Sequence, residues 1–581
     1  MKSFRLLTAL FCLFLSQGCG DKNVPTPEPE KPPVEYPEPV DPETASTVGF
    51  FIDDWKPKNF QVPQTTSGTV PTGAANVTID IDASKVIAKV PFTMFGHNSV
   101  SFRENISGQE PLMTHIKNLN IGIVRFPGGS ISDSYFWNRN FQDKPADAPD
   151  SIMDEDGTQK YWRWNYWYGK NNPVERSNLD DYYSLLQKTG SQGMITVNYG
   201  YARYGRADNP VAQAAHLAAD WVRYDNGRTK YWEIGNENHG GWEMGYRINT
   251  AKNKDGQPEY INGRLYGQHA AVFIDSMQKA AAETGKKIYI GIGVIDAYNS
   301  WLWGASQAAA QWNNGVMSAA GGKADFYIVH NYYVGNNENT FAQIINSAVD
   351  KTGAMVKYVT DDAAKNGAPV KPVALTEYNI FATGSAGSMQ QVSYVAGMHN
   401  MLVALEAAKN KMGAALRWDF INGFDNGADH GMFNLGDEPG GTKWNPRPSF
   451  YYYYFLQKFF GDRMLQSASG NSNVLSYASS FTSGEKAAVL VNKASSGQIV
   501  KVNLKNTNYG NKYYWYTLTG GNDNGDFSGK VYVNNIGPEG QATGGPANDY
   551  ATIKAFAADA SGEIKISLPA KGVVFLVVSK K

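Results

Sequence analysis

Cysteine is almost absent from this 581-residue chain: its two cysteines, Cys12 and Cys19, both lie within the first twenty residues. The rest of the chain therefore has no thiols for disulfide bonds or for metal sites built from thiolates. The sequence also has almost no net charge, −1 at pH 7. This argues against a nucleic-acid partner, because proteins that bind nucleic acids present a basic face.

Long apolar runs are absent as well, apart from one at the N-terminus. Residues 6–15 are apolar and follow a basic start, but the run is too short to cross a bilayer. The sequence Leu15-Ser16-Gln17-Gly18-Cys19 resembles the lipobox of bacterial lipoproteins. This resemblance implies a signal peptide over residues 1–18 and a lipid on the Cys19 sulfur. It predicts a protein at the cell surface or in the periplasm, lipid-anchored to a bacterial (outer) membrane. An ordinary signal peptide with an incidental cysteine is the alternative.

Proline is concentrated in residues 19–45, which carry eight prolines with interspersed glutamates. Such a tract cannot build a core and favours extended polyproline II, at about 3.1 Å per residue. We interpret it as a linker between anchor and body. Residues 46–89 are expected to form N-terminal strands, since residues 77–82 alternate apolar and polar side chains.

Residues 90–462 are predicted to form a catalytic (β/α)₈ TIM barrel, an α/β fold. Apolar runs rich in β-formers alternate with helical stretches such as 211–222 and 391–409. Runs of this kind suit parallel strands covered on both faces. An open doubly wound sheet is the alternative, but its usual Gly-rich first turn is missing. The eight predicted strands are 90–98, 121–129, 194–200, 231–237, 287–294, 326–333, 372–379 and 415–422.

Beyond residue 462 the helical periodicity disappears. Short apolar strands such as 487–491, 500–504 and 573–578 are separated by Gly, Asn and Ser turns. This pattern predicts a C-terminal β-sandwich over residues 463–581, to which the 77–82 strand can add.

Two carboxylates stand at the ends of predicted barrel strands. Glu237 closes strand four (Tyr231-Trp232-Glu233-Ile234-Gly235-Asn236-Glu237), and Glu377 closes strand seven (Val373-Ala374-Leu375-Thr376-Glu377). Barrel active sites lie where strands end on the carboxyl face, so both side chains are expected at the barrel mouth. Two such groups suit glycosidic cleavage, in which one protonates the leaving oxygen and the other attacks the anomeric carbon.

These two motifs resemble clan A retaining glycoside hydrolases, and most nearly the family 51 arabinofuranosidases and endoglucanases. The resemblance spans about residues 77–460. It implies that Glu237 is the acid/base, that Glu377 is the nucleophile, and that no cofactor is needed. It further implies that Asn236 binds a sugar hydroxyl, that Arg125 keeps the nucleophile ionised, and that His330 and Tyr332 flank it. Both Asn236 and Glu237 reach the site only if the pleat breaks at the strand tip.

One departure concerns substrate choice. Family 51 arabinofuranosidases usually carry Asn after Arg-Phe-Pro-Gly-Gly, whereas this chain carries Ser130. Arabinofuranose specificity therefore stays open beside that of the similar family 86 agarases and porphyranases. His97 on strand one and Trp418 on strand eight are further candidates for lining the substrate pocket. Glu233 is interpreted as an inner-barrel partner of an arginine, and Glu243 as a loop residue.

The insertion after strand two has three notable features. Its aromatic run 161–168 suits either a buried hairpin or a wall that stacks on sugars. Residues 154–156 (Asp-Glu-Asp) suit a solvated turn or, alternatively, oxygen ligands for Ca²⁺. Loop arginines are candidates for contacts with sulfate or uronate groups: Arg139, Arg163, Arg176, Arg203 and Arg206.

The sequence as a whole predicts a retaining glycoside hydrolase that acts on an oligo- or polysaccharide of plant or algal origin, with no metal. One alternative is an agarase- or porphyranase-type endo-hydrolase. A second is a surface glycan-binding protein that has lost catalysis, and a third is a sugar lyase or isomerase. The sugar, the linkage and the oligomeric state are left open by the sequence.

Overall fold

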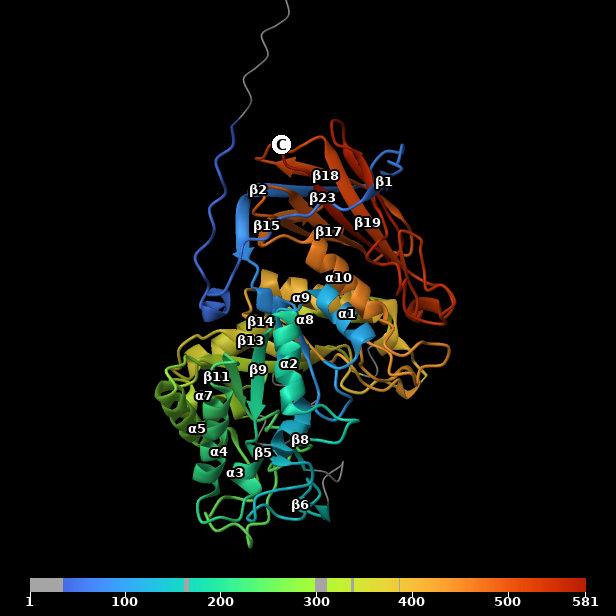
Figure 1. Cartoon of the computed structure of the whole chain (residues 1–581). Helices are drawn as coiled ribbons and strands as arrows, with labels where there is room; N and C mark the ends of the chain where they lie inside the picture. The colour runs from blue at the N-terminus through green and yellow to red at the C-terminus, as the bar shows by residue number, and fades with distance from the viewer. Residues whose placement is uncertain (1–34, 161–166, 298–310, 336–338, 386) are drawn as a thin grey trace, which may run out of the picture. The chain divides into compact units, whose positions relative to one another are not determined.

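A computed structural model of the chain describes residues 35–160, 167–297, 311–335, 339–385 and 387–581 (Figure 1). The signal peptide, Cys19, most of the linker and residues 161–166 of the aromatic run lie outside these ranges. All helices and strands discussed below belong to the compact unit formed by residues 37–581. Within the described residues, none of the helices has both the length and the apolar character needed to cross a bilayer.

The predicted (β/α)₈ barrel is confirmed. Eight parallel strands close on themselves in the order β10-β11-β12-β13-β14-β3-β4-β9. In chain order these strands are β3 (Gly96–Asn98), β4 (Ile123–Phe126), β9 (Gln192–Val197), β10 (Tyr231–Ile234), β11 (Tyr289–Gly293), β12 (Phe326–Tyr332), β13 (Val373–Asn379) and β14 (Ala414–Arg417). The first strand is shorter than the predicted 90–98, because a 3-10 turn at Phe92–Met94 follows Pro91.

Helices follow the barrel strands and bury their apolar faces on them. The stretch predicted at 211–222 is α4 (Pro210–Asp225), and the stretch at 391–409 is α9 (Tyr394–Lys409). Capping side chains fix several helix starts, because they satisfy the free N–H groups of the first turn: Asn178 caps α2 and Thr340 caps α8. The other helices are α1 (Glu110–Leu119), α2 (Leu179–Thr189), α3 (Gly200–Tyr204), α5 (Gly263–Glu283), α7 (Trp312–Ala320), α8 (Phe341–Lys365) and α10 (Pro448–Phe459).

The C-terminal part is an 11-stranded sheet. Apolar side chains from its strands pack together in one core, as the predicted sandwich requires. The N-terminal strand β2 (Val77–Lys89) lies inside it, antiparallel to β15 and parallel to β18. The other strands are β1 (Thr65–Ser67), β15 (Arg463–Ser469), β16 (Val474–Ser480), β17 (Lys486–Asn492), β18 (Gln498–Lys505), β19 (Lys512–Gly520), β20 (Val531–Val533), β21 (Ala555–Asp559), β22 (Ile564–Leu568) and β23 (Val573–Val578).

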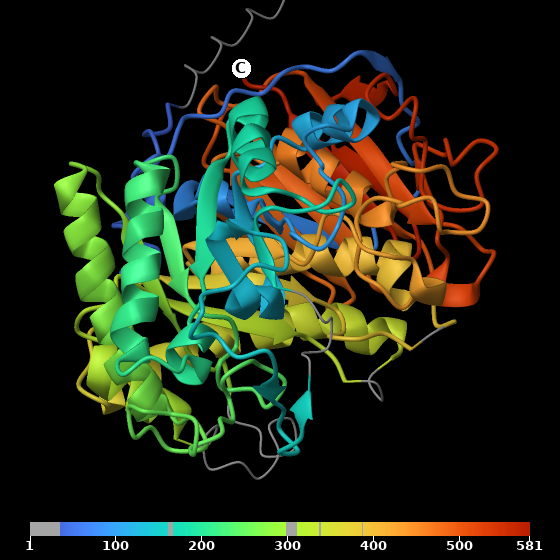
Figure 2. The same cartoon turned by 60° about the horizontal axis from the view of Figure 1, so that its bottom comes forward.

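Helices α9 and α10 carry the contact between barrel and sheet (Figures 1 and 2). Phe455 of α10 packs on Tyr516 of β19, with ring centroids 4.6 Å apart. Strand β23 is therefore covered on both faces, which explains its continuous apolar sequence. The sheet covers the barrel where α9 and α10 lie. The loops after the carboxyl ends of the strands are therefore free to build the site.

Residues 46–52 close the amino-terminal end of the barrel. Their sequence did not indicate this role. Phe50 and Phe51 lie in a 3-10 turn, η1 (Gly49–Ile52). Phe50 stacks on Tyr289 at 3.6 Å, and Phe51 on Tyr231 at 4.8 Å. Both tyrosines are the first residues of their strands, so the two phenylalanines plug the amino-terminal end of the barrel.

An insertion follows strand β4 and lies toward the carboxyl end of β9 (Figure 1). Its strands are β5 (Tyr135–Asn140), β6 (Ile152–Met153), β7 (Gln159–Lys160) and β8 (Tyr168–Asn171). Where the aromatic run is described, it is packed: Trp167 lies against Phe136 and Tyr204, at 5.4 and 5.8 Å. The acidic segment 154–156 forms a turn, with Gly157 N donating to Asp154 O at 2.9 Å.

Candidate active site

The tip of strand β10 breaks the alternation of side chains. The strand ends at Ile234, and then Gly235 and Glu237 adopt positive φ angles of 71° and 40°. A side chain at 235 would lie 2.0 Å from the Asn238 amide oxygen, so only glycine fits there. This break turns Asn236 and Glu237 toward the same side, as their predicted shared site requires.

Glu237 and Glu377 face each other across the barrel mouth. One carboxylate oxygen of each lies within 4.8 Å of the other, and an imidazole nitrogen of His330 lies within the same distance of both. The two glutamate side chains are 16% and 7% exposed, so each remains reachable from outside. The separation is close to the 5–5.5 Å that the double-displacement geometry needs.

Arg125 of β4 is fully buried and connects four strand ends. Its guanidinium donates to Glu377 at 3.1 Å, to Glu233 at 2.6 Å and to Asn236 at 2.8 Å. A buried cation is costly unless paired, and here two carboxylates compensate it. The sequence predicts Glu233 as an inner-barrel partner of an arginine, and the structure shows that this arginine is Arg125. The same guanidinium holds both the predicted nucleophile and the predicted sugar-binding amide in place.

His330 and Tyr332 of β12 lie beside the two acids. His330 Nδ1 is 2.9 Å from Glu237 and 3.7 Å from Glu377, while its Nε2 is 3.0 Å from Thr376 Oγ1. The Tyr332 hydroxyl donates to Glu377 at 2.5 Å. The imidazole therefore lies within reach of both carboxyl groups.

The charge state of the acid pair follows from these contacts. Burial would raise the pKa of Glu237, but the hydrogen bond and the charge of His330 lower it to about 2. The pKa of Glu377 is raised by burial and by the neighbouring Glu237, against the opposing effects of His330 and Arg125. Burial lowers the pKa of His330, but the neighbouring Glu377 and Glu237 raise it more, so the net shift is upward. The two carboxyl groups and the imidazole thus influence one another, with the pKa of Glu237 lowered and the pKa values of Glu377 and His330 raised.

Trp418 lies at the barrel mouth after β14, as the sequence predicted. Its ring lies over Gly129, where an added Cβ would be only 2.8 Å from the indole. Its backbone oxygen accepts from Asn379 Nδ2 at 2.7 Å, which ties the eighth strand end to the seventh. This position suits a floor beneath a sugar ring.

His97 is a correction, because the structure does not bring it to the site. Its ring packs on Phe420 and on Tyr453 of α10, at 4.9 and 5.1 Å, and is 1% exposed. Strand alternation gives the inward position to its neighbour Asn98, which accepts from Arg125 at 3.0 Å. The inward residue of β3 was missed because an asparagine beside a histidine carried the weaker chemical signal.

Glu243 was also missed as a site residue. It lies in the loop predicted for it, but its side chain turns inward and is 4% exposed. Its carboxyl accepts from Ser130 Oγ at 2.7 Å and from Asn236 Nδ2 at 2.9 Å. Burial, with Asp133 and Glu237 nearby, raises its pKa well above the usual value. Ser130, the departure noted in the sequence, thus belongs to the same hydrogen-bond network as Asn236.

Trp242 belongs to the site as well. Its indole N–H donates to Glu237 Oε2 at 2.8 Å, so Glu237 has a donor on each carboxyl oxygen. A side chain at Gly240 would lie 2.3 Å from the Trp242 indole, so this glycine leaves room for the ring.

A metal ion would find its ligands in Glu237, His330 and Glu377. The Arg125 guanidinium, 3.1 Å from Glu377, already supplies a positive charge at this point and opposes a cation there. The arrangement therefore suits acid–base and nucleophilic chemistry by the side chains themselves.

Comparison with known proteins gives the site a context, although no protein-family model matches the chain. An intracellular exo-α-(1→5)-L-arabinofuranosidase of Bifidobacterium longum is 23% identical over 358 residues, which are 54% of this chain and 53% of that protein. A protein of the same name from Acetivibrio thermocellus is 23% identical over 245 residues, 40% and 41% of the two chains. This chain thus spans about half the length of the curated relatives it matches.

Solved structures share the fold over most of the chain. The α-L-arabinofuranosidase of Thermotoga maritima superposes with a TM-score of 0.59 at 14% identity, covering 87% of this chain and all of that one. CelM2, a bifunctional glucanase-xylanase from a metagenome library, gives 0.56 at 14% identity, covering 88% and 100%. The resemblance to clan A, and most nearly to family 51, that the strand-end motifs indicated is confirmed by these similarities.

Proposed function

We propose that this chain is a retaining glycoside hydrolase with Glu237 as acid/base and Glu377 as nucleophile. One observation carries the proposal: the two carboxylates lie within 4.8 Å of each other at the ends of strands four and seven. Arg125 and Tyr332 donate hydrogen bonds to Glu377, which orient it and stabilise its charge for attack. A glycan-binding protein without catalysis would have no need of this constellation.

In the first step a Glu377 oxygen attacks the anomeric carbon as the bond to the leaving oxygen breaks. Glu237 gives a proton to that oxygen, and a glycosyl ester remains on Glu377. The 2.9 Å contact between His330 Nδ1 and Glu237 gives the proton a route to Glu237.

In the second step water attacks the anomeric carbon of the ester. Glu237, now a carboxylate, takes a proton from this water, and the ester bond to Glu377 breaks. The sugar leaves with its original anomeric configuration, because the centre was inverted twice. Trp242 and His330 keep the Glu237 carboxylate in place for both proton transfers.

For the substrate we propose a plant polysaccharide with arabinofuranosyl or related glycosidic bonds. Arabinofuranosidases among the relatives and a glucanase-xylanase among the structures support this class, and the comparisons give no support to an agarase. Ser130, which stands where family 51 arabinofuranosidases usually carry an asparagine that contacts the sugar, donates a hydrogen bond to Glu243. We therefore expect the sugar preference to differ in detail from that of family 51.

The proposal is tested by assaying the chain with 4-nitrophenyl α-L-arabinofuranoside, arabinan, xyloglucan and β-glucan. We expect release of nitrophenol or reducing ends from at least one of them. Glu377→Ala should lower kcat by at least about 10³-fold, whereas Glu283→Ala, a surface carboxyl on α5 that is 44% exposed, should not change it. Full activity of Glu377→Ala would refute the assignment.

We also propose that Cys19 carries a lipid that anchors the protein to a bacterial membrane. Support comes from the lipobox-like sequence before it and from the proline-rich linker after it. Expression of the full chain with labelled palmitate, followed by detergent phase partitioning, should label the protein and send it to the detergent phase. Cys19→Ser should abolish both results. A labelled Cys19→Ser chain would contradict the proposal.

A further inference from the structure

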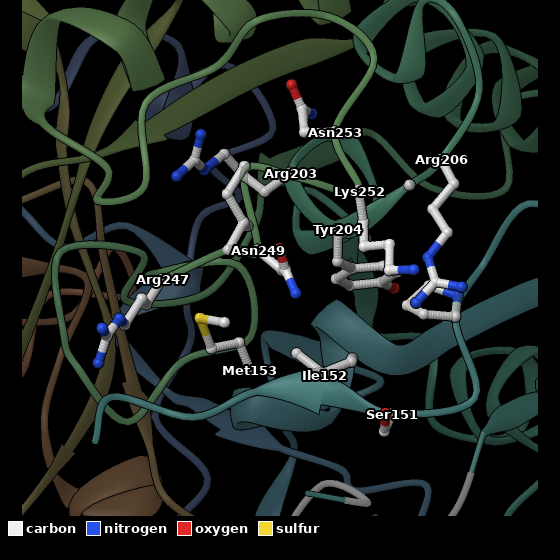
Figure 3. Close-up of a pocket in the computed structure, with 13 residues that line it drawn as sticks. Ser151, Ile152, Met153, Arg203, Tyr204, Arg206, Arg247, Asn249, Lys252 and Asn253 are labelled. Carbon is white, nitrogen blue, oxygen red and sulfur yellow. The ribbon is translucent and has the colours of Figure 1, made fainter. Parts of the chain in front are cut away.

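A pocket lies beside the active-site loop, and its lining combines apolar side chains with basic ones (Figure 3). Its cavity volume is about 30 Å³, and it is built by segments that follow β4, β9 and β10. Of the described residues that line it, four are basic and none is acidic. The basic ones are Arg203, Arg206, Arg247 and Lys252. The lining therefore carries more basic than acidic side chains.

Arg203 contributes a buried charge that no carboxylate neutralises among the described contacts. Its guanidinium donates to Gly245 O at 2.9 Å, to Gln257 Oε1 at 2.8 Å and to the carbonyls of Pro258 and Glu259. Burial lowers its pKa, but only to about 10, so the side chain stays charged at neutral pH. A buried cation held by neutral acceptors favours an anion nearby.

Arg206 and Lys252 supply charge that is not buried, since Arg206 is half-buried and Lys252 is exposed. Within the part of the chain that the structure describes, neither side chain forms an ion pair with a carboxylate. Figure 3 shows both side chains on the same side of the pocket, next to Tyr204. By contrast Arg247 is paired with Glu259 at 2.7 Å. Two like charges without a partner in one pocket are stabilised when an anion binds between them.

Asn253 adds a donor that the protein itself does not use. Its Oδ1 accepts from the backbone N–H groups of Asp255 and Gln257, at 3.2 and 2.8 Å, and this fixes the amide. Its Nδ2 is buried and has no hydrogen-bond partner among the described residues. An unsatisfied buried donor is costly. Figure 3 places this amide at the edge of the pocket, away from Tyr204 and Ile152, so the main contacts to an anion would come from the basic side chains.

The pocket is physically tied to the catalytic loop. Residues 247–253 belong to the same β10–α5 connection as Glu237, Trp242 and Glu243. The bond from Arg203 Nε to Gly245 O holds this connection two residues after Glu243. A glycan whose scissile bond lies at the two acids can thus extend over the same loop.

We propose that this pocket binds an anionic substituent, a uronate carboxylate or a sulfate ester, on a sugar of the polysaccharide substrate. Planar guanidinium groups match the oxygens of both anions. The inference rests on the proposed glycan-processing function and narrows its substrate to an acidic polysaccharide.

The test measures binding in the Glu377→Ala background by affinity electrophoresis. Two matched pairs of polymers serve as probes: a uronate-bearing pectic arabinan with its carboxyl-reduced form, and a chemically sulfated arabinan with the parent arabinan. We expect the acidic member of at least one pair to bind about tenfold or more tightly, and the responsive pair identifies the anion. Arg206→Gln combined with Lys252→Gln should abolish the difference.

Lys254→Gln is the matched control, because Lys254 lies in the same loop, does not line the pocket and is paired with Asp208 at 3.3 Å. It should leave the difference intact. Equal binding of acidic and neutral polymers, or a difference that survives the double substitution or is lost equally in Lys254→Gln, would overturn the proposal. Failure of the wild type to hydrolyse any glycoside would instead remove the proposed function, while the binding result still reports on the pocket.

Discussion

The amide of Asn236 and the carboxyl of Glu243 are joined by a 2.9 Å hydrogen bond, with Nδ2 as the donor. The other end of the same amide, Oδ1, accepts from Arg125 at 2.8 Å. Glu243 therefore fixes which way the amide faces, and through it the side of the site where a sugar hydroxyl would bind. The sequence placed one of these residues in the site and left the other in a loop.

Removing the Glu243 carboxyl should disorder this amide. We expect Glu243→Ala to lower kcat/KM by about 10- to 100-fold, as the loss of a buried hydrogen bond implies. Glu243→Gln retains an acceptor and should recover much of this loss. Steady-state kinetics of the two variants on one aryl glycoside distinguish positioning from folding. Equal losses in both variants would show that the acceptor is not what matters.

The alkaline limb of the pH–activity profile should depend on His330. Its pKa is raised above 6.5 by the two carboxylates, against the effect of burial. The imidazole thus keeps its proton above pH 6.5, and activity that needs this proton is lost as the pH rises through the raised value. In His330→Gln this limb should move or vanish in a plot of kcat/KM against pH. An unchanged alkaline limb would remove His330 from the proton path.

Stability in mild acid should depend on His269. Burial lowers its pKa to about 4 in the folded chain, so between about pH 6.5 and 4 the unfolded chain binds the proton and the folded chain does not. Stability is therefore lost as the pH falls through this window, by up to about 1.4 kcal/mol per pH unit. His269→Gln should flatten the slope in urea unfolding. His216→Gln, a change at a side chain 73% exposed on α4, should leave it as in the wild type.

The aromatic plug at the base of the barrel should be a large contributor to stability. Phe51 is 3% exposed and stacks on Tyr231. Phe51→Ala should cost about 3–5 kcal/mol through lost burial and the cavity left behind, and Phe51→Leu clearly less. Thermal unfolding measures both. The control is Val62→Ala, because the Val62 side chain is 61% exposed. If Phe51→Ala unfolded at the same temperature as Val62→Ala, the role of the plug in stability would be contradicted.

The barrel was predictable from the sequence because its strands are covered on both faces and their apolar runs stand out. β13, for example, has all seven residues buried. Glu237 and Glu377 were predictable because each ends such a run. The plug was not, since Phe50 and Phe51 come from a short segment without periodicity and find their partners about 180 to 240 residues away in the chain.

Inward and outward positions were the harder part of the site. His97 and Asn98 are neighbours on a three-residue strand, and such a strand gives no alternation from which to read the buried face. Glu243 reaches the site through a loop whose path depends on positive φ angles at Gly235 and Glu237. Long-range contacts of this kind leave little local signature in a sequence.

The central claim is that Glu377 forms a covalent bond with the sugar while Glu237 transfers the proton. It is tested most directly by incubating Glu237→Ala with an aryl glycoside that carries a good leaving group and mapping the product by peptide mass spectrometry. Without the base the second step is slow, so the account predicts one glycosyl group that accumulates on Glu377. A sugar attached to a different residue, or release of an inverted sugar with no adduct, would contradict it.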